Sequence, residues 1–202
     1  MDAASLSVES PNKRKPGARR LQILQTLATM LEDPKGEKVT TAALAAKLDV
    51  SEAALYRHFA SKAQMFEGLI EFIESTIFGL INEISTKEAS GLKQVRRIVV
   101  MLLEFAQTNR GMTRVLVGDA LVNEHERLQE RMNQLLDRIE TSIKQSYRVA
   151  STQNEIPADF DFTAHASLIV AYVVGRWLRF AKSGFKRQPA DGLEAQLPTL
   201  LT

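Results

Sequence analysis

Residues 39–62 of this chain read VTTAALAAKLDVSEAALYRHFASK, and this stretch decides how its N-terminal part folds. Apolar residues at helical spacing predict two short helices that are joined by a tight turn and share one buried seam. The seam consists of Leu44, Leu48, Val50, Leu55 and Phe59. The second helix is expected to begin at Ser51, an N-cap residue type, and to run through the Tyr-Arg-His-Phe segment. Such a helix-turn-helix places its second helix in the DNA major groove.

Small, hydroxyl and basic residues surround the seam. Ala53 permits close approach to base edges, and its methyl group can pack on a thymine methyl. Tyr56, Arg57 and Lys62 can reach phosphates, and Thr40 lies at a helix N-terminus that suits a phosphate. The candidate DNA-binding residues are Lys13, Arg14, Thr40, Thr41, Ser51, Glu52, Ala53, Ala54, Tyr56, Arg57, His58 and Lys62.

In VTTAALAAKL and LYRHF-x-SK the chain resembles the TetR family of bacterial DNA-binding proteins. The resemblance continues through TNRGMTRVLVGDAL and covers residues 19–200, and it is strongest to the members of the family that act in nucleoid occlusion. It implies an all-α, TetR-like fold with an N-terminal three-helix helix-turn-helix head and a C-terminal helical dimerisation domain. It also implies a homodimer that binds double-stranded DNA at palindromic, operator-like sites.

The same resemblance implies a protein partner, the tubulin-like division protein FtsZ, whose polymerisation the DNA-bound dimer would antagonise over the nucleoid. The partner surface is expected on the helix that links head and body and on the apolar helix after it, at Phe72, Met101 and Asn109. Glu104 and Thr108 depart from the pattern, which tends to carry glycine and arginine there. The alternative is a ligand-responsive TetR-type repressor, which a closed cavity with convergent polar groups in the body would favour.

Composition sets bounds on the class of protein. The 202 residues suit one helical core and a small head domain. There is no cysteine, so disulfides and cysteine-ligated zinc are excluded, and a reducing cytoplasm fits. The polar residues 1–16 do not resemble a signal peptide, and the longest apolar run, 164–175, is too short for a membrane span. We therefore expect a soluble cytoplasmic protein that is associated with the nucleoid.

Charge is distributed unevenly along the chain. The net charge is +2, but residues 11–62 carry ten Lys and Arg against five Asp and Glu, a balance of +5. Residues 63–202 carry sixteen against seventeen, a balance of −1. A basic head on a nearly neutral body is typical of a DNA-binding module when it accompanies a helix-turn-helix.

The chain divides into three predicted parts. Residues 1–17 form a disordered basic tail, residues 18–62 the DNA-binding domain, and residues 63–202 the dimerisation and partner-binding domain. The capping pattern of Ser61 and Gln64 predicts the start of a long helix that ends at about Ile84. The other helices are expected at 19–31, 91–108, 110–118, 119–149, 160–185 and 191–201.

Two apolar or small-residue faces are candidates for the dimer interface. Ser167, Ala171 and Gly175 recur every four residues on a bulky helix and would let another backbone come close, so we assign them to the interface. A second stripe fits an intramolecular core better than an interface, although both remain open. It consists of Leu128, Met132, Leu135 and Ile139.

Neither a catalytic motif nor a metal motif is present in the sequence. His58, His125 and His165 are scattered, and HExxH, GxSxG and a Gly-rich phosphate loop are absent. The Glu124-His125-Glu126 run is more typical of a solvated helix face than of a metal site. Six larger side chains fit a core better than a ligand pocket, namely Met101, Phe105, Phe162, Tyr172, Trp177 and Phe180. We therefore predict a non-enzyme without cofactor or metal, and a small-molecule ligand is not expected.

Overall fold

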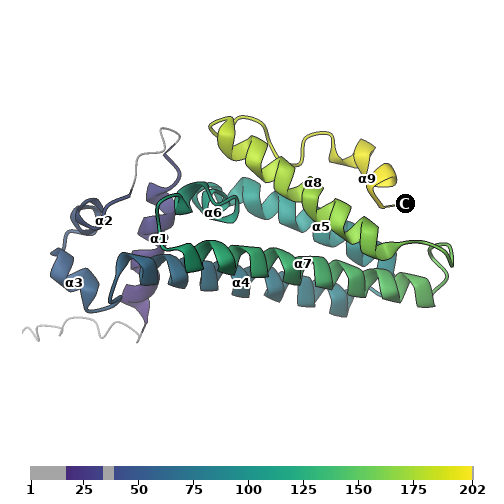
Figure 1. Cartoon of the computed structure of the whole chain (residues 1–202), viewed down its shortest axis with the longest axis horizontal. Coiled ribbons are helices and arrows are strands. Elements are labelled where there is room, and N and C mark those ends of the chain that lie inside the picture. The colour runs from purple at the N-terminus through teal and green to yellow at the C-terminus, as the bar shows by residue number, and fades with distance from the viewer. Residues whose placement is uncertain (1–16, 34–38, 202) are drawn as a thin grey trace, which may run out of the picture.

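The computed structural model describes residues 17–33 and 39–201. Lys13, Arg14 and most of the predicted 1–17 tail lie outside these residues. Every regular element in the described ranges is helical, which confirms the all-α prediction (Figure 1). The elements are α1 (Ala18–Met30), α2 (Thr41–Lys47), α3 (Glu52–Tyr56), α4 (Lys62–Lys87), α5 (Gly91–Thr108), α6 (Arg110–Leu116), the 3-10 turn η1 (Asp119–Leu121), α7 (Glu126–Thr152), α8 (Phe162–Lys182) and α9 (Leu193–Leu201).

Hydroxyl side chains start four of these helices. Thr40, Ser51, Ser61 and Ser90 each stand at the N-cap and accept a hydrogen bond from the backbone N–H three residues later. At α4 the predicted capping pattern is confirmed, since Gln64 also reaches back and its Oε1 accepts from the Ala60 N–H at 2.9 Å. The sequence therefore marks the start of the long helix that links head and body.

The head consists of α1, α2 and α3 around the predicted seam. Leu44, Leu55 and Phe59 are fully buried, and Leu48 and Val50 are half-buried against the same core. Arg20 closes the outer side of the seam, because its guanidinium lies 4.1 Å from the centre of the Phe59 ring and donates to the His58 carbonyl at 2.5 Å.

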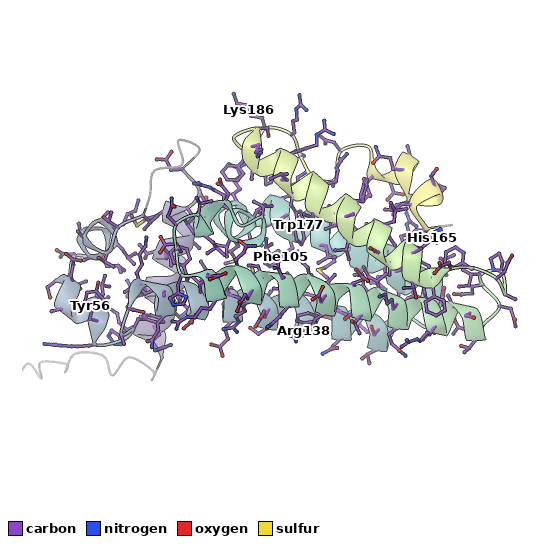
Figure 2. All side chains as sticks on the ribbon, viewed as in Figure 1. Tyr56, Phe105, Arg138, His165, Trp177 and Lys186 are labelled. Carbon is purple, nitrogen blue, oxygen red and sulfur yellow. The ribbon has the colours of Figure 1, made fainter. Side chains whose placement is uncertain are left out.

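The body is a layered bundle in which α4 and α7 run side by side and α8 lies obliquely across α5 and α7 (Figure 1). The α7 stripe that begins at Leu128 is 0–1% exposed within the single chain, so it belongs to the intramolecular core. Trp177 and Phe105 lie in that core, between α5, α7 and α8 (Figure 2). Arg138 of α7 stacks on Phe78 of α4 at 3.9 Å. No helix in the described ranges is long and apolar enough to cross a membrane.

The prediction of one helix over residues 119–149 is wrong. The chain turns twice there, because Gly118 and Asn123 both adopt a left-handed backbone with φ of 76° and 64°. Between them lies only η1, and α7 begins at Glu126, where the ring nitrogen Nδ1 of His125 accepts from the Arg127 N–H. The helix then continues to Thr152, past the predicted end at Val149.

Head and body are joined by close backbone contact as well as by α4. Gly111 of α6 lies so close to α1 that a Cβ built on it would come 1.9 Å from the Ala28 carbonyl oxygen. Arg114 of α6 donates to the Leu31 and Asp33 carbonyls at the end of α1 and pairs with Asp119 at 2.6 Å. The orientation of the head is therefore set by backbone packing on α6.

Candidate nucleic-acid interface and partner groove

The candidate recognition helix is shorter than predicted. Helix α3 ends at Tyr56, and Arg57 and His58 form a turn that directs Phe59 into the core. The predicted continuation through Phe59 is therefore wrong, since burial of that ring turns the chain away from the helix axis. Tyr56 is 44% exposed, Arg57 is exposed and His58 is half-buried. Figure 2 shows Tyr56 at the end of the molecule that is farthest from the body.

The two motif helices are tied together by a polar contact. Thr41 of α2 donates its hydroxyl to the Glu52 carboxylate of α3 at 2.6 Å. The Thr40 hydroxyl is occupied as well, because it caps α2 by accepting from the Ala43 N–H at 3.1 Å. Ser51, Glu52 and Ala53 remain exposed on α3, and Ala54 is half-buried. The candidate base-reading residues thus lie together on α3, and the Thr41–Glu52 contact joins the two helices.

Lys62 occupies a different position from the other candidates. Its ammonium group pairs with Glu124 at 2.5 Å and lies 5.6 Å from the centre of the Phe66 ring. Both members of the pair are largely shielded, with 23% and 11% of their side chains exposed. Lys62 therefore joins the start of α4 to the body, and a phosphate would have to compete with Glu124 for it.

Arg57 is exposed directly after α3 and does not share the ion pair that occupies Lys62, so we expect Arg57→Ala to weaken binding to all DNA sequences similarly. The slope of log K against log salt should become shallower by about 0.9, the contribution of one neutralised phosphate. Binding titrations over a series of salt concentrations measure that slope. Lys87→Ala, which removes an exposed lysine at the far end of α4, should leave it unchanged. A wild-type slope for Arg57→Ala would contradict the phosphate contact.

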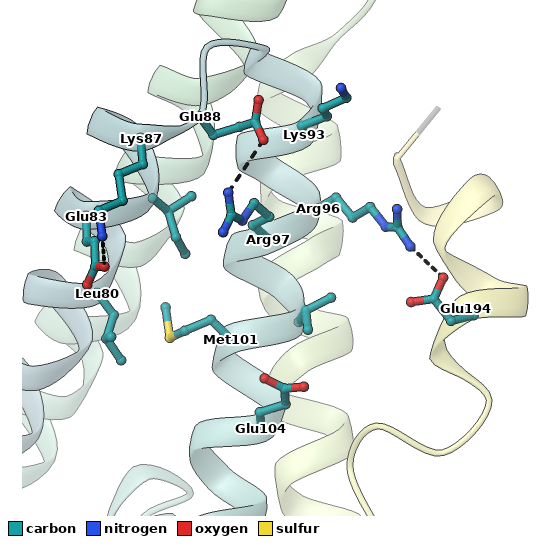
Figure 3. A pocket seen from close by; sticks show the side chains of 12 residues that line it. Leu80, Glu83, Lys87, Glu88, Lys93, Arg96, Arg97, Met101, Glu104 and Glu194 are labelled. Atoms are coloured by element: carbon teal, nitrogen blue, oxygen red, sulfur yellow. Dashed lines mark hydrogen bonds and ion pairs between the residues drawn. The ribbon is translucent and has the colours of Figure 1, made fainter.

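A groove of about 690 Å³ lies on the body between α4, α5 and α9 (Figure 3). Its apolar part is formed by Leu80, Ile84, Val100 and Met101. Figure 3 shows Leu80 and Met101 directed into the space between α4 and α5. Of the three candidate partner residues, only Met101 lines the groove itself.

Charged side chains of both signs surround this apolar part. Arg97 pairs with Glu88 at 3.5 Å, and Arg96 pairs with Glu194 of α9 at 2.6 Å (Figure 3). Lys87 pairs with Glu83, and its hydrogen bond and positive charge lower the pKa of that carboxyl group. The Lys87–Glu83 and Arg96–Glu194 pairs are exposed, so each contributes little to stability and can be exchanged for a ligand at small cost, whereas Glu88 is half-buried.

Phe72 extends the α4 side of the groove toward the head. It is 37% exposed, although its neighbours Ile70 and Ile73 are fully buried. It lies three helical turns before Glu83, and therefore on the same face of α4. The short link at 88–90 makes α4 and α5 antiparallel neighbours, so Phe72 is level with the end of α5, where Asn109 caps the helix. Asn109 is half-buried, and its Nδ2 donates to the Phe105 carbonyl at 2.8 Å.

Helix α8 carries an outward face that has no packing partner within the described protomer. Ser167 and Ala171 are exposed there, and Leu168 is 53% exposed. A Cβ built on Gly175 would meet no atom within 4 Å. Small residues flanked by exposed leucines are unusual on a solvated face, whereas the outward face of α7 is polar.

The remaining candidates serve structural roles in the single chain. The carboxylate of Glu124 pairs with Lys62, and His125 caps α7. The His165 ring lies 4.1 Å from that of Phe160, and its Nδ1 is 2.9 Å from the Asp161 carbonyl. Among the residues that the structure describes, no group of three His, Cys, Asp or Glu side chains is arranged to hold a metal ion.

Two family models match the chain. One describes bacterial regulatory proteins of the tetR family and matches residues 36–69, and the other, a SlmA-like model of the tetracyclin repressor-like C-terminal domain, matches residues 89–202. The nucleoid occlusion factor SlmA of Idiomarina loihiensis is 49% identical over 178 residues, which are 88% of this chain and 91% of that protein. SlmA of Shewanella pealeana is 48% identical, with 88% and 90% covered.

Solved structures of lower similarity share the fold. The transcriptional regulator FadR from Bacillus subtilis, determined in complex with stearoyl-CoA, superposes with a TM-score of 0.74 at 12% identity and covers 90% of this chain and 97% of its own. A TetR-like regulator from Rhodococcus sp. RHA1 gives 0.70 at 20% identity, with 92% and 96% covered. At these identities the match concerns the fold alone.

Proposed function

The chain belongs to the TetR family, in the group of the nucleoid occlusion factor SlmA, and we propose that its homodimer binds chromosomal DNA through α3 and antagonises FtsZ assembly through the groove between α4 and α5. The observation that carries the proposal is the exposed Phe72, which lies on the same face of α4 as the groove residue Glu83, three helical turns closer to the head. It stands on α4, the helix whose N-terminal part packs against α1 of the DNA-binding head. The DNA-binding head and the proposed partner groove thus lie at the two ends of α4.

The groove suits a protein segment better than a small metabolite. It is an open groove with an apolar strip between charges of both signs, and Phe72 offers an aromatic anchor farther along α4. Peptide grooves commonly combine an apolar floor with such a polar rim. The exposed pair Arg96–Glu194, and the exposed Arg97 that pairs with the half-buried Glu88, can exchange partners with charged groups of a bound segment.

The outward face of α8 supports the homodimer. Burying Leu168 and Leu178 against a second copy removes apolar surface from water, and Ser167, Ala171 and Gly175 allow the two backbones to approach. A dimer also explains how so short a recognition helix can support tight binding to DNA. One helix reads few bases, and two half-sites bound as one unit give the required affinity.

The ligand-responsive repressor fits the body less well. Trp177, Phe105 and Phe180 are buried in the core, and the Trp177 indole N–H donates to the Leu102 carbonyl at 3.0 Å. Across the described residues no buried side-chain nitrogen or oxygen atom lacks a hydrogen-bond partner. The described part of the core therefore offers no unpaired polar side-chain group to which an inducer could bind. The chain is proposed to act by binding, as a regulator at the nucleoid in the cytoplasm, and not by catalysis.

We expect Phe72→Ala to abolish antagonism of FtsZ assembly and to leave operator affinity within about twofold, because truncating an exposed aromatic anchor removes binding energy without opening the core. Sedimentation or light scattering of FtsZ with operator DNA measures the first effect, and operator titration with a melting curve measures the second. Phe78→Ala is the matched control, since it removes a phenyl ring from the α7 side of the same helix. Equal loss of DNA binding and FtsZ antagonism in Phe72→Ala would make Phe72 a structural residue.

A nucleoid occlusion factor and a ligand-responsive repressor also differ in the DNA sites that they require. Many dispersed sites that avoid the replication terminus are expected for nucleoid occlusion. A single site beside the gene for this protein would favour the repressor. Genome-wide mapping of bound DNA distinguishes these patterns without a mutant.

A further inference from the structure

The C-terminal end of α8 and the loop after it carry a concentrated positive charge. Residues 176–188 contain five Lys and Arg and no Asp or Glu, although residues 63–202 have a balance of −1. The five cations are Arg176, Arg179, Lys182, Lys186 and Arg187. Figure 2 places Lys186 at this end of α8, where the side chain projects away from the body. The cluster is separate from both the head and the groove.

Part of the cluster lines a small recess. Its volume is about 150 Å³, and its walls are Arg176, Arg179, Arg187, Gln188 and Asp191. Arg179 and Arg187 are exposed and make neither an ion pair nor a side-chain hydrogen bond with any described residue. A cation at the end of a helix can serve the helix dipole alone, which accounts for Arg179. It does not account for Arg187, which enters the recess from the loop.

The loop is held in a defined conformation. The Ser183 hydroxyl accepts from the Lys186 and Arg187 N–H groups at 3.1 and 2.9 Å. Arg176 holds the C-terminal part of the loop, because its Nε donates to the Pro189 carbonyl at 2.7 Å and its Nη2 donates to the Asp191 carbonyl. The Arg176 guanidinium and the backbone that carries Arg187 are therefore positioned before any ligand arrives, which reduces the entropy cost of binding.

We propose that this recess binds the phosphate group of a soluble ligand, such as the terminal phosphate of a nucleotide. Its lining carries three positive charges and one negative charge, so a dianionic phosphate balances it. Guanidinium groups match the several oxygens of a phosphate and bind it through paired, charge-assisted hydrogen bonds. A concave site of this size holds one such group, whereas a DNA duplex or a bilayer would engage Lys182 and Lys186 on the outer surface equally. The Asp191 carboxylate is the one unfavourable neighbour.

Calorimetric titration of the full-length dimer with pyrophosphate, at constant ionic strength, tests the site. We expect saturable binding of one pyrophosphate per protomer, weakened about tenfold or more in Arg179→Ala and in Arg187→Ala. Asp191→Asn should tighten binding, because it removes the repulsive carboxylate. Lys186→Ala is the matched control, since it removes an equal charge outside the recess, and its affinity should stay within about twofold of wild type.

Three outcomes would overturn the proposal. One is the absence of saturable binding, and another is equal weakening in Lys186→Ala and Arg179→Ala, which would mean diffuse attraction. The third is binding to vesicles that contain phosphatidylglycerol without binding of pyrophosphate, which would assign the cluster to a membrane surface. Operator DNA should not displace pyrophosphate, because the recess is separate from the head.

Discussion

Gly175→Leu is expected to dissociate the homodimer and to lower operator affinity by about 100-fold, the scale of the avidity lost when two linked sites become independent. The protomer has room for the new side chain, because an added Cβ meets nothing within 4 Å. Among the described residues nothing lies close to the added Cβ, so we expect the new side chain to strike a second copy, and overpacking a close helix contact is unfavourable. Light scattering and operator titration on the same preparation measure both effects.

Gly79→Leu is the matched control for the dimer. Gly79 stands on α4 with equally open surroundings, so this variant should remain dimeric and bind the operator normally. A melting curve for each variant separates dissociation from unfolding. If Gly175→Leu remains a dimer with wild-type operator affinity, the interface lies elsewhere than on the Ser167–Gly175 face of α8.

Gly111→Ala should cost about 3 kcal/mol of folding free energy, at the upper end of what overpacking usually costs. The added Cβ would lie 1.9 Å from the Ala28 carbonyl oxygen, which is backbone and cannot rotate away. Helix α6 must then move away from α1, and operator affinity should fall because the head loses its orientation. Denaturant titration gives the free energy of unfolding.

A glycine-to-alanine substitution at Gly79 should change the folding free energy in the opposite direction. Gly79→Ala adds a methyl group where nothing lies within 4 Å, and alanine is favoured over glycine in a helix by about 1 kcal/mol. It should therefore stabilise the protein. Equal stability of Gly111→Ala and wild type would show that α1 and α6 separate without cost, contrary to the close packing described.

Local sequence patterns predicted well where helices begin, but they predicted poorly where a helix is interrupted. The helix over 91–108 matches the expected range because Ser90 caps it and its apolar face is regular. The predicted helix over 119–149 failed because Leu121 and Val122 continue an apolar pattern, although the chain turns at Gly118 and Asn123. The recognition helix ended early for a tertiary reason, the burial of Phe59.

The candidate sites were predictable only where a single helix presents them. The small-residue face of α8 lies on one helix, since Ser167, Ala171 and Gly175 share it, and its role in the dimer stays a prediction. The groove combines α4, α5 and α9, and its pair Arg96–Glu194 joins residues 98 positions apart. No local pattern indicates such a pair. Nor did any pattern indicate that Lys62 would pair with Glu124, which only the packing of α4 against the η1–α7 segment brings near.

The continuity of α4 has a mechanical consequence. Its 26 residues form a rod of about 39 Å that begins in the head and ends beside the groove. A tilt of about 5° at one end of such a rod would displace the other by about 3 Å, comparable to the helix shifts that switch regulatory proteins. A reorientation of the head that tilted α4 would thus be carried to the groove wall. Since such coupling is reciprocal, a segment bound in the groove would change operator affinity by the same factor as the operator changes its own.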